Sequence, residues 1–355
     1  MPVVTNGRLI YVQHPTTHYE PGVHTKYVEE QLDTDTVPLN GGVLIKTLVV
    51  SADPYMRYRM RDPNIPHFSP AVVIGQPIDN FVIGTILRSE DPQFAAGDYV
   101  SAFSTFETYA VYPGPKELQH FLKYIVKIPK PENLPLSIFL GTCGLPGKTA
   151  YSAWKIFGEP KAKTSKTLFV SGAAGPLGTF VVEYAKITSP HLKVIACAGS
   201  QQKVDILKSV GADVAFNYKE ADVNKVLAEN GPIDIYWDNV AGSITDAALQ
   251  NMNMFGTIIA CGAISGASNP KDGAVTNFGL IFQKVITVHG FLYGFGDDAQ
   301  KALGTFDADI MPLVASGKIT SREHRYQGLQ EAERALAEVH SGKNVGKSIV
   351  IVSHE

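Results

Sequence analysis

A turn of small residues is the part of the sequence best suited to binding a charged ligand. The apolar run Thr167–Ser171 leads into Gly172–Gly178, and a stretch with helical spacing follows. Such a turn lets the backbone approach a pyrophosphate closely, while the N–H groups at the start of the helix meet its charge. Small residues also suit tight packing of a helix on a strand, so the spacing alone is a weak signal. Its place after the first strand of an alternating series favours a dinucleotide site.

The residues after the second apolar run indicate which dinucleotide would fit. A site that prefers NAD usually places Asp or Glu there, where the carboxylate holds the ribose 2′-hydroxyl. Here that place is Ala198–Ser200, and the first charge beyond it is Lys203, which could sit over a 2′-phosphate. The sequence therefore predicts NADP(H) rather than NAD(H). The alternative is that Lys203 is a solvated residue in the first turn of a helix.

Two tyrosines are candidate hydroxyl donors to a substrate oxygen. Tyr55 follows an apolar strand and an Asp-Pro turn, which could project it into a cleft. Tyr293 comes just after the last predicted parallel strand, at the edge where ligands bind in open α/β sheets. For either residue, the alternative is a ring that packs and a hydroxyl that meets water.

Metal ligands are not grouped in the sequence. The three cysteines stand more than fifty residues apart, and the ten histidines form no HxxxH helix and no cluster with cysteine. A catalytic zinc needs such ligands. We therefore expect no metal, and we interpret His67, His120 and His289 as surface or core residues. Without a metal, hydroxyl or backbone donors would have to stabilise charge that develops on an oxygen.

Composition places the chain among folded proteins of more than one domain. Its 355 residues are 45% hydrophobic and 18% charged, which argues against intrinsic disorder and favours two globular units. A net charge of -3 gives no reason to expect nucleic acid or anionic lipid as a partner. No signal peptide and no membrane segment are expected, and a cytoplasmic location is predicted.

The pattern of apolar runs in the sequence changes near Lys166. Before about residue 128, short runs of Val, Ile, Tyr and Phe are cut by Pro and Gly, which indicates an irregular β-rich unit. After Lys166, apolar runs alternate with helical stretches, which indicates parallel strands covered by helices. The predicted strands are Thr167–Ser171, Lys193–Ala198, Ile233–Trp237, Thr257–Gly262 and Lys284–Gly290. The predicted helices are Pro176–Ile187, Gln201–Val210, Ala221–Glu229 and Ser243–Met252, and a last helix, Leu329–Val339, precedes a strand, Ser348–Val352.

Seven short segments carry a family resemblance over nearly the whole chain. In order they are Asp53–Arg57, Gly141–Tyr151, Ala173–Gly178, Phe216–Lys219, Asp238–Val240, Cys261–Ser265 and Gly342–Lys347. With them the chain resembles the zinc-independent medium-chain dehydrogenase/reductases, specifically the alkenal and enone double-bond reductases that include the prostaglandin and leukotriene reductase branch.

The resemblance implies an α/β protein with two domains. A GroES-like, β-rich substrate domain would span residues 1–128 and be completed by residues 313–355. A Rossmann domain with a doubly wound parallel sheet would span residues 129–312 and bind NADP(H). A homodimer is often found in the family and is expected here.

The resemblance also implies roles for single residues. Lys203 and Tyr218 match positions that hold the 2′-phosphate, and Leu145 with Thr149 match the nicotinamide end. Tyr55 matches a residue at the substrate pocket. The full set expected to contact the cofactor is Leu145, Thr149, Ala174, Gly175, Leu177, Gly178, Gly199, Lys203, Tyr218, Asn239, Cys261, Ala263, Ile264, Phe291, Tyr293 and Asn344.

One position departs from the family. Where the family usually has a tyrosine after Ile-Ser-x, thought to bind the nicotinamide ribose and help deliver a proton, this chain has Ala267. Tyr55, Tyr293 or a water molecule could take over that role, and the sequence does not choose among them.

The resulting prediction is an NADPH-dependent reductase of the carbon–carbon double bond in α,β-unsaturated aldehydes and ketones. Its substrate would be a small hydrophobic enal or enone, and Tyr55 and Tyr293 would be the catalytic candidates. An NADPH:quinone reductase is the alternative enzyme. A nucleotide-binding sensor or assembly module without turnover is the alternative outside catalysis.

Overall fold

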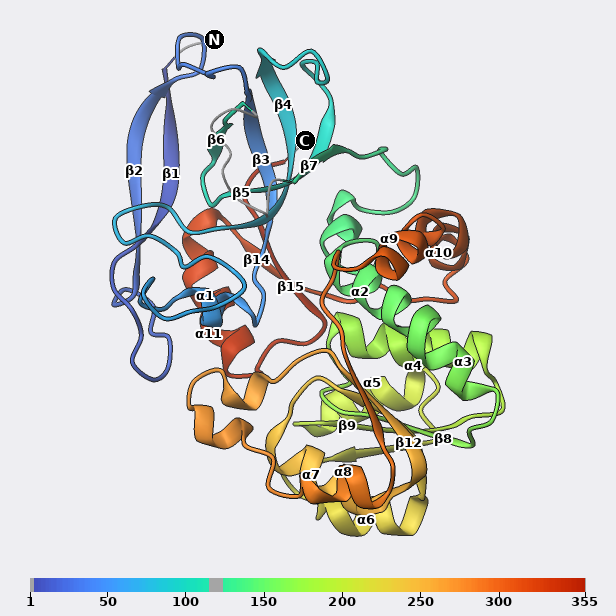
Figure 1. The fold of residues 1–355 in the computed structure, drawn as a ribbon. Helices are drawn as coiled ribbons and strands as arrows, with labels where there is room; N and C mark the ends of the chain where they lie inside the picture. Colours follow the sequence, from blue (N-terminus) through green and yellow to red (C-terminus); the bar gives the residue numbers. More distant parts are fainter. Residues whose placement is uncertain (1–2, 115–123, 355) are drawn as a thin grey trace. The chain divides into compact units, whose positions relative to one another are not determined.

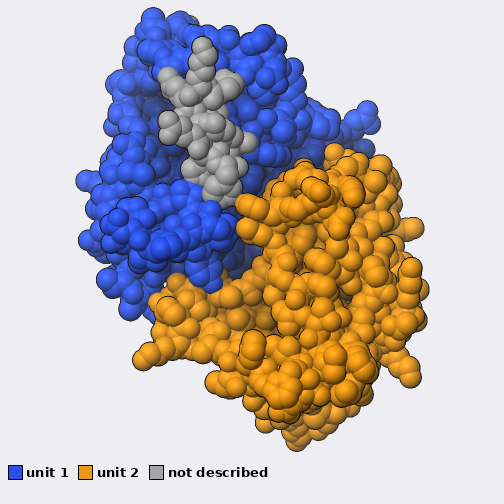
Figure 2. All heavy atoms as spheres, viewed as in Figure 1, with its two compact units in different colours: residues 1–140, 323–355 blue, residues 141–322 orange. Residues whose placement is uncertain are grey.

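The chain folds into two compact units. A computed structural model describes residues 3–114 and 124–354. Unit 1 comprises residues 1–140 and 323–355, and unit 2 comprises residues 141–322 (Figure 2). The chain thus leaves unit 1 after residue 140 and returns to it at residue 323.

Both unit boundaries lie later in the chain than 128 and 312, the positions predicted from the sequence. A short helix, η1 (Leu136–Leu140), packs its leucines against Leu48 and Ile349 of unit 1. A cut at residue 312 would divide α10 (Phe306–Ala315), whose Asp309 accepts a 2.5 Å hydrogen bond from the hydroxyl of Tyr151 in unit 2. Packing of these two short helices therefore decides where each unit ends.

Unit 1 is built on a seven-stranded sheet and a separate two-stranded ribbon (Figure 1). The sheet follows the order β14-β15-β3-β4-β5-β7, and β6 also pairs with β3. A last helix, α11 (Ala332–His340), packs Leu336 and Val339 into the core of this unit. The strands of the unit are β1 (Val3–Tyr11), β2 (Thr25–Asp33), β3 (Val43–Ser51), β4 (Asp79–Ser89), β5 (Tyr99–Thr105), β6 (Tyr109–Tyr112), β7 (Ile125–Lys127), β14 (Glu323–Gln327) and β15 (Lys347–Ile351).

The C-terminal strand sets the register that matters for the candidate site. Strand β15 runs antiparallel to β3, with Ile349 opposite Ser51. Two residues further along each strand, Lys347 therefore comes level with Asp53, just beyond the end of β3. On the other side of β3, Val82 of β4 lies opposite Val50. The ends of these three strands, far apart in sequence, thus meet at one place.

Unit 2 contains a six-stranded parallel sheet in the order β10-β9-β8-β11-β12-β13. This order confirms the predicted doubly wound Rossmann-type sheet, in which the strand order reverses between β8 and β11. One strand was not predicted, β10, because its four residues are too short an apolar run to stand out. The strands are β8 (Thr167–Val170), β9 (Lys193–Ala198), β10 (Val214–Asn217), β11 (Ile233–Asp238), β12 (Met252–Ala260) and β13 (Thr287–Gly290).

The helices of unit 2 follow the predicted alternation. In α4, Pro176 at the first position fits the helix start, and Phe180, Val181 and Tyr184 are buried at helical spacing. Among the described residues no helix is both long and apolar enough to cross a bilayer. The main helices are α2 (Leu145–Ala153), α4 (Pro176–Thr188), α5 (Gln201–Ser209), α6 (Val223–Asn230), α7 (Gly242–Asn251), α8 (Gly279–Gln283), α9 (Asp297–Leu303) and α10 (Phe306–Ala315).

Candidate active site

The glycine turn between β8 and α4 needs its small residues for two different reasons. Gly172 has φ +55°, a left-handed conformation that side chains other than hydrogen resist. A Cβ on Gly178 would lie 2.5 Å from both the Cα and the carbonyl oxygen of Ala173, so this glycine lets α4 pack directly on the turn. These two positions are explained by the fold itself.

Neither the backbone conformation nor the packing of the ligand-free chain requires a glycine at position 175. A Cβ at this position would meet no atom within 4 Å, and the backbone φ of -78° suits any residue. Gly175 caps α4 without a side-chain hydrogen bond, and the first N–H groups of a helix have no partner within it. Open space beside the positive end of a thirteen-residue helix fits the pyrophosphate of a dinucleotide.

Positive charge gathers at the ends of β9 and β10. A Cβ on Gly199 would lie 2.9 Å from the hydroxyl of Tyr218 and 3.1 Å from Cε of Lys219, so both side chains pack over this glycine. Burial, and then the charge of Lys219, lower the pKa of Lys203. Two cations that interact in this way, beside a partly exposed tyrosine, fit a phosphate dianion. Lys219 was missed as a site residue, although it directly follows Tyr218.

The other predicted cofactor residues of unit 2 meet at the carboxyl edge of the sheet. The N–H of Cys261 donates to the carbonyl of Asp238 at 2.9 Å, which places the Cys261 turn beside Asn239. The N–H of Phe291 donates to Ala260 at 3.0 Å. The ends of β11, β12 and β13 therefore lie side by side. The predicted residues on these ends are Asn239, Cys261, Ala263, Ile264, Phe291 and Tyr293.

Both the oxygen and the nitrogen of the Asn239 side-chain amide form hydrogen bonds within the protein. Its Oδ1 accepts from the indole N–H of Trp237 at 3.1 Å, and its Nδ2 donates to the carbonyl of Ser171 at 2.8 Å. The adjacent Asp238 is buried and accepts 2.8 Å bonds from the N–H groups of Val240 and Ala241. Asn239 thus joins the end of β11 to the start of the glycine turn and holds the edge of the sheet in place.

The two predicted residues of α2 are linked to each other. The hydroxyl of Thr149 donates to the carbonyl of Leu145 at 2.7 Å, one helical turn earlier. The hydroxyl hydrogen is therefore used, and lone pairs of the oxygen are left for a ligand donor.

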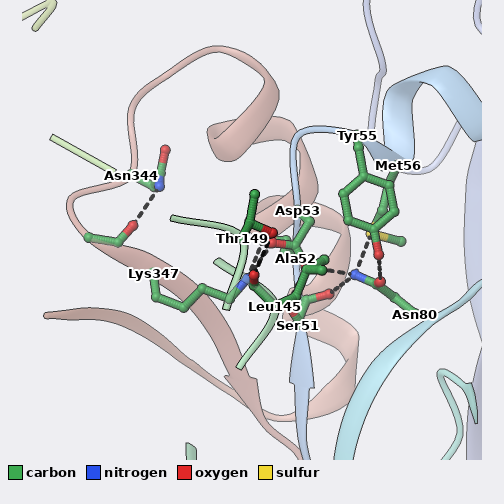
Figure 3. A network of polar contacts seen from close by, with 11 residues as sticks. Ser51, Ala52, Asp53, Tyr55, Met56, Asn80, Leu145, Thr149, Asn344 and Lys347 are labelled. Atoms are coloured by element: carbon green, nitrogen blue, oxygen red, sulfur yellow. Dashed lines mark hydrogen bonds and ion pairs between the residues drawn. The ribbon is translucent and has the colours of Figure 1, made fainter. Parts of the chain in front are cut away.

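Tyr55 is tied into a buried polar network at the end of β3 (Figure 3). Its hydroxyl donates to Oδ1 of Asn80, and Nδ2 of Asn80 donates to Asp53 Oδ2 at 2.9 Å. Asp53 also pairs with the ammonium group of Lys347 at 2.5 Å. Burial, followed by the charge of Asp53, raises the pKa of Tyr55 well above its usual value. The phenol is thus neutral, but its one hydrogen is engaged by Asn80.

Unit 1 contains Tyr55 and Asn344, whereas the remaining predicted residues belong to unit 2. Asn344 lies between α11 and β15, and its Nδ2 donates to the carbonyl of Gly346 at 2.8 Å. Two residues of the Tyr55 network, Asn80 and Lys347, were not predicted as part of a site. No spacing in the sequence joins them, because β4 and β15 meet β3 only in the folded sheet.

No metal centre can be built from the residues that the structure describes. Within 3–114 and 124–354 there is no group of three or more His, Cys, Asp or Glu side chains able to hold an ion. His67 stacks on Tyr58, and His289 stacks on Phe157 with ring centres 4.2 Å apart. His120, the third histidine interpreted as a non-ligand, lies outside the described residues.

Each of the two units contains a segment that matches a known family model. Residues 176–308 match the family model described as "zinc-binding dehydrogenase", and residues 17–120 match the "N-terminal domain of oxidoreductase". The first of these names refers to zinc, and the described residues of this chain do not fit that metal.

Relatives align over most of the chain. A 2-alkenal reductase (NADP(+)-dependent) of Nicotiana tabacum is 37% identical over 88% of this chain and 88% of its own length. A (+)-pulegone reductase of Mentha piperita is 35% identical over 89% of each chain. The crystal structure of CurA from Vibrio vulnificus in complex with NADPH superposes with a TM-score of 0.85, at 29% identity, over 98% of this chain and all of its own. The chain therefore belongs to the medium-chain dehydrogenase/reductase family, together with the 2-alkenal and pulegone reductases.

Proposed function

We propose that the protein uses NADPH to reduce the carbon–carbon double bond of α,β-unsaturated aldehydes and ketones. One observation carries the proposal. Unit 2 contains the glycine turn, the cations Lys203 and Lys219, and the carboxyl ends of β11, β12 and β13, in a chain related to enzymes named for alkenal and pulegone reduction. The physiological enal or enone depends on side chains that the family alone does not fix.

The cofactor is NADP(H). Gly175 and the start of α4 would hold the pyrophosphate, and Lys203, Tyr218 and Lys219 would hold the 2′-phosphate. When bound, the cofactor supplies a hydride to the β-carbon of the substrate. The reduction is completed by a proton at the α-carbon, and the negative charge that develops on the carbonyl oxygen in between needs a hydrogen-bond donor.

The two proposed catalytic tyrosines lie in different units. The hydroxyl hydrogen of Tyr55 is engaged by Asn80, which argues against Tyr55 as the donor to the substrate oxygen and for a role in contacting the substrate. Tyr293, a backbone N–H or a water molecule is the proposed donor. Ala267, in place of the family tyrosine, has no hydroxyl to contribute.

The test is NADPH oxidation with a panel of long aliphatic enals, aryl enals, enones and quinones, followed by identification of the products. The proposal expects saturated aldehydes and ketones from the conjugated substrates. An allylic alcohol with its alkene intact would contradict it. Turnover of quinones without turnover of any enal or enone would favour the quinone reductase instead, and NADPH binding without turnover of the panel would favour a sensor.

Replacing Lys203 with alanine is expected to weaken NADPH binding about 10- to 100-fold, because one charge-assisted hydrogen bond to phosphate is worth roughly 1.5–3 kcal/mol. NADH binding should change little, since NADH lacks the 2′-phosphate. Calorimetric titration of both cofactors measures the effect. Lys208→Ala, which removes an exposed lysine from the same helix, is the control. An unchanged preference for NADPH over NADH in Lys203→Ala would exclude Lys203 from the phosphate site.

A second copy of the chain is the proposed partner, and it would bind at the edge of the unit 2 sheet. No other described strand pairs with the outer edge of β13. Helix α8 buries none of its residues, and Phe278, Phe282 and Val285 are 69%, 76% and 52% exposed. Large apolar side chains beside an open strand edge are typical of a self-complementary interface. The cytoplasmic location stays a prediction from the sequence.

Substituting aspartate for Phe282 is expected to convert a dimer into a monomer, because a buried carboxylate at the centre of an apolar interface is strongly unfavourable. Light scattering coupled to gel filtration should give the wild type twice the 38.4 kDa mass of the chain, and the variant that mass itself. Phe68→Asp, at a phenylalanine that is 57% exposed in unit 1, should leave the dimer intact. A monomeric wild type would contradict the proposed interface.

A further inference from the structure

Asn80 lies between Tyr55 and the buried ion pair of unit 1 (Figure 3). Its Oδ1 accepts the hydroxyl hydrogen of Tyr55. Its Nδ2 donates to the carbonyl of Ser51 at 2.7 Å and to the carboxylate of Asp53 at 2.9 Å. The side chain is fully buried, so every one of these groups would be costly to leave without a partner.

The Ser51 carbonyl and the Asp53 carboxylate determine the orientation of the Asn80 side-chain amide. If the amide were turned over, Oδ1 would face the Ser51 carbonyl and the Asp53 carboxylate, and three acceptors would meet without a hydrogen among them. The nitrogen must therefore face β3, which leaves Oδ1 facing Tyr55. An amide oxygen can only accept, so the phenol has to be the donor in this pair.

The carboxylate that fixes Asn80 is itself held in place. Lys347 pairs with the other oxygen of Asp53, and the side chains of Lys347 and Asp53 are only 2% and 9% exposed. The hydroxyl of Ser51 donates to Asp53 Oδ2 as well. The orientation of Asn80 is thus set by contacts from β3 and β15, neither of which depends on a bound ligand.

We propose that Asn80 is a positioning residue: by taking the hydroxyl hydrogen of Tyr55 it holds the phenol ring in one orientation against the substrate, and Tyr55 does not donate to the carbonyl oxygen of the substrate. The inference rests on the proposed function, in which Tyr55 contacts the substrate. A ring held in one orientation costs less entropy to engage than a rotating one, and placement of this kind contributes directly to the rate.

The kinetic test is a double-mutant cycle. Asn80→Leu keeps a similar volume and removes the amide, and we expect it to lower kcat/KM for an enal about tenfold, a modest part of the roughly hundredfold that misplacement can cost. In a Tyr55→Phe background the same substitution should have little further effect, because the group it positions is gone. Effects of Asn80→Leu and Tyr55→Phe that simply multiply would overturn the inference.

Asn6 provides a matched control. It is also a buried asparagine of unit 1, 3% exposed, and both ends of its amide bond to the backbone of Tyr109, at 3.0 Å and 2.9 Å. Asn6→Leu should also cost stability, since it removes two hydrogen bonds of a buried side chain where Asn80→Leu removes three. Its effect on kcat/KM should be the same whether position 55 is tyrosine or phenylalanine.

A spectroscopic measurement on the resting protein tests the orientation without turnover. The ultraviolet resonance Raman difference between wild type and Tyr55→Phe isolates the tyrosine doublet of Tyr55, whose intensity ratio distinguishes a donating phenol from an accepting one. A donor signature that is lost in Asn80→Leu supports the inference, and an acceptor signature in the wild type overturns it. Failure to reduce any enal would refute the proposed function but would leave this result to decide the role of Asn80.

Discussion

Replacing Lys347 with methionine is expected to lower the free energy of unfolding of unit 1 by about 3–5 kcal/mol, the usual cost of removing one partner of a buried ion pair. Lys347 is 2% exposed and its ammonium group lies 2.5 Å from Asp53 Oδ1. Methionine fills most of the space of the lysine stem, so the loss comes mainly from the carboxylate left without its counter-ion. Denaturant unfolding followed by circular dichroism measures it.

A second substitution distinguishes charge from packing. Combining Lys347→Met with Asp53→Asn should recover much of the lost stability, because the pair becomes neutral. A double variant no more stable than Lys347→Met alone would contradict this account.

Apolar runs in the sequence predicted most of the Rossmann sheet because its central strands β8, β9 and β11 are buried on both faces. The ranges predicted for β8 and β9 agree with the structure to within one residue. The start of β13 was placed too early, at Lys284. In the structure Val285 takes a left-handed φ of +53° in the turn that follows α8, so the strand begins only at Thr287.

Some parts of the candidate site are continuous in sequence, whereas others depend on contacts between distant residues. The glycine turn and the segment around Tyr218 are continuous in sequence, so spacing and the family resemblance were enough to find them. The Tyr55 network joins residues that are 27 and 294 positions apart, from Asp53 to Asn80 and to Lys347. Such contacts depend on strand register, which no local pattern in a single sequence determines.

Replacing Gly175 with valine is expected to weaken NADPH binding by about 100-fold while the protein still folds. The protein should still fold because, in the ligand-free chain, a Cβ at this position would have no atom within 4 Å. The added side chain would instead occupy the place of a pyrophosphate seated at the start of α4, and forced overpacking of this kind costs up to about 3 kcal/mol. Fluorescence titration with NADPH gives the affinity.

Gly178→Ala is the comparison that separates the ligand from the fold. Its Cβ would lie 2.5 Å from the backbone of Ala173, so α4 must shift and the ligand-free protein should lose about 1–3 kcal/mol of stability. Gly175→Val should cost only about 1 kcal/mol, the price of a poorer helix cap. Substitution of Gly175 should therefore lower mainly the affinity for NADPH, whereas substitution of Gly178, three residues later, should lower mainly the stability of the protein. If Gly175→Val bound NADPH as tightly as the wild type, the dinucleotide could not lie over this turn.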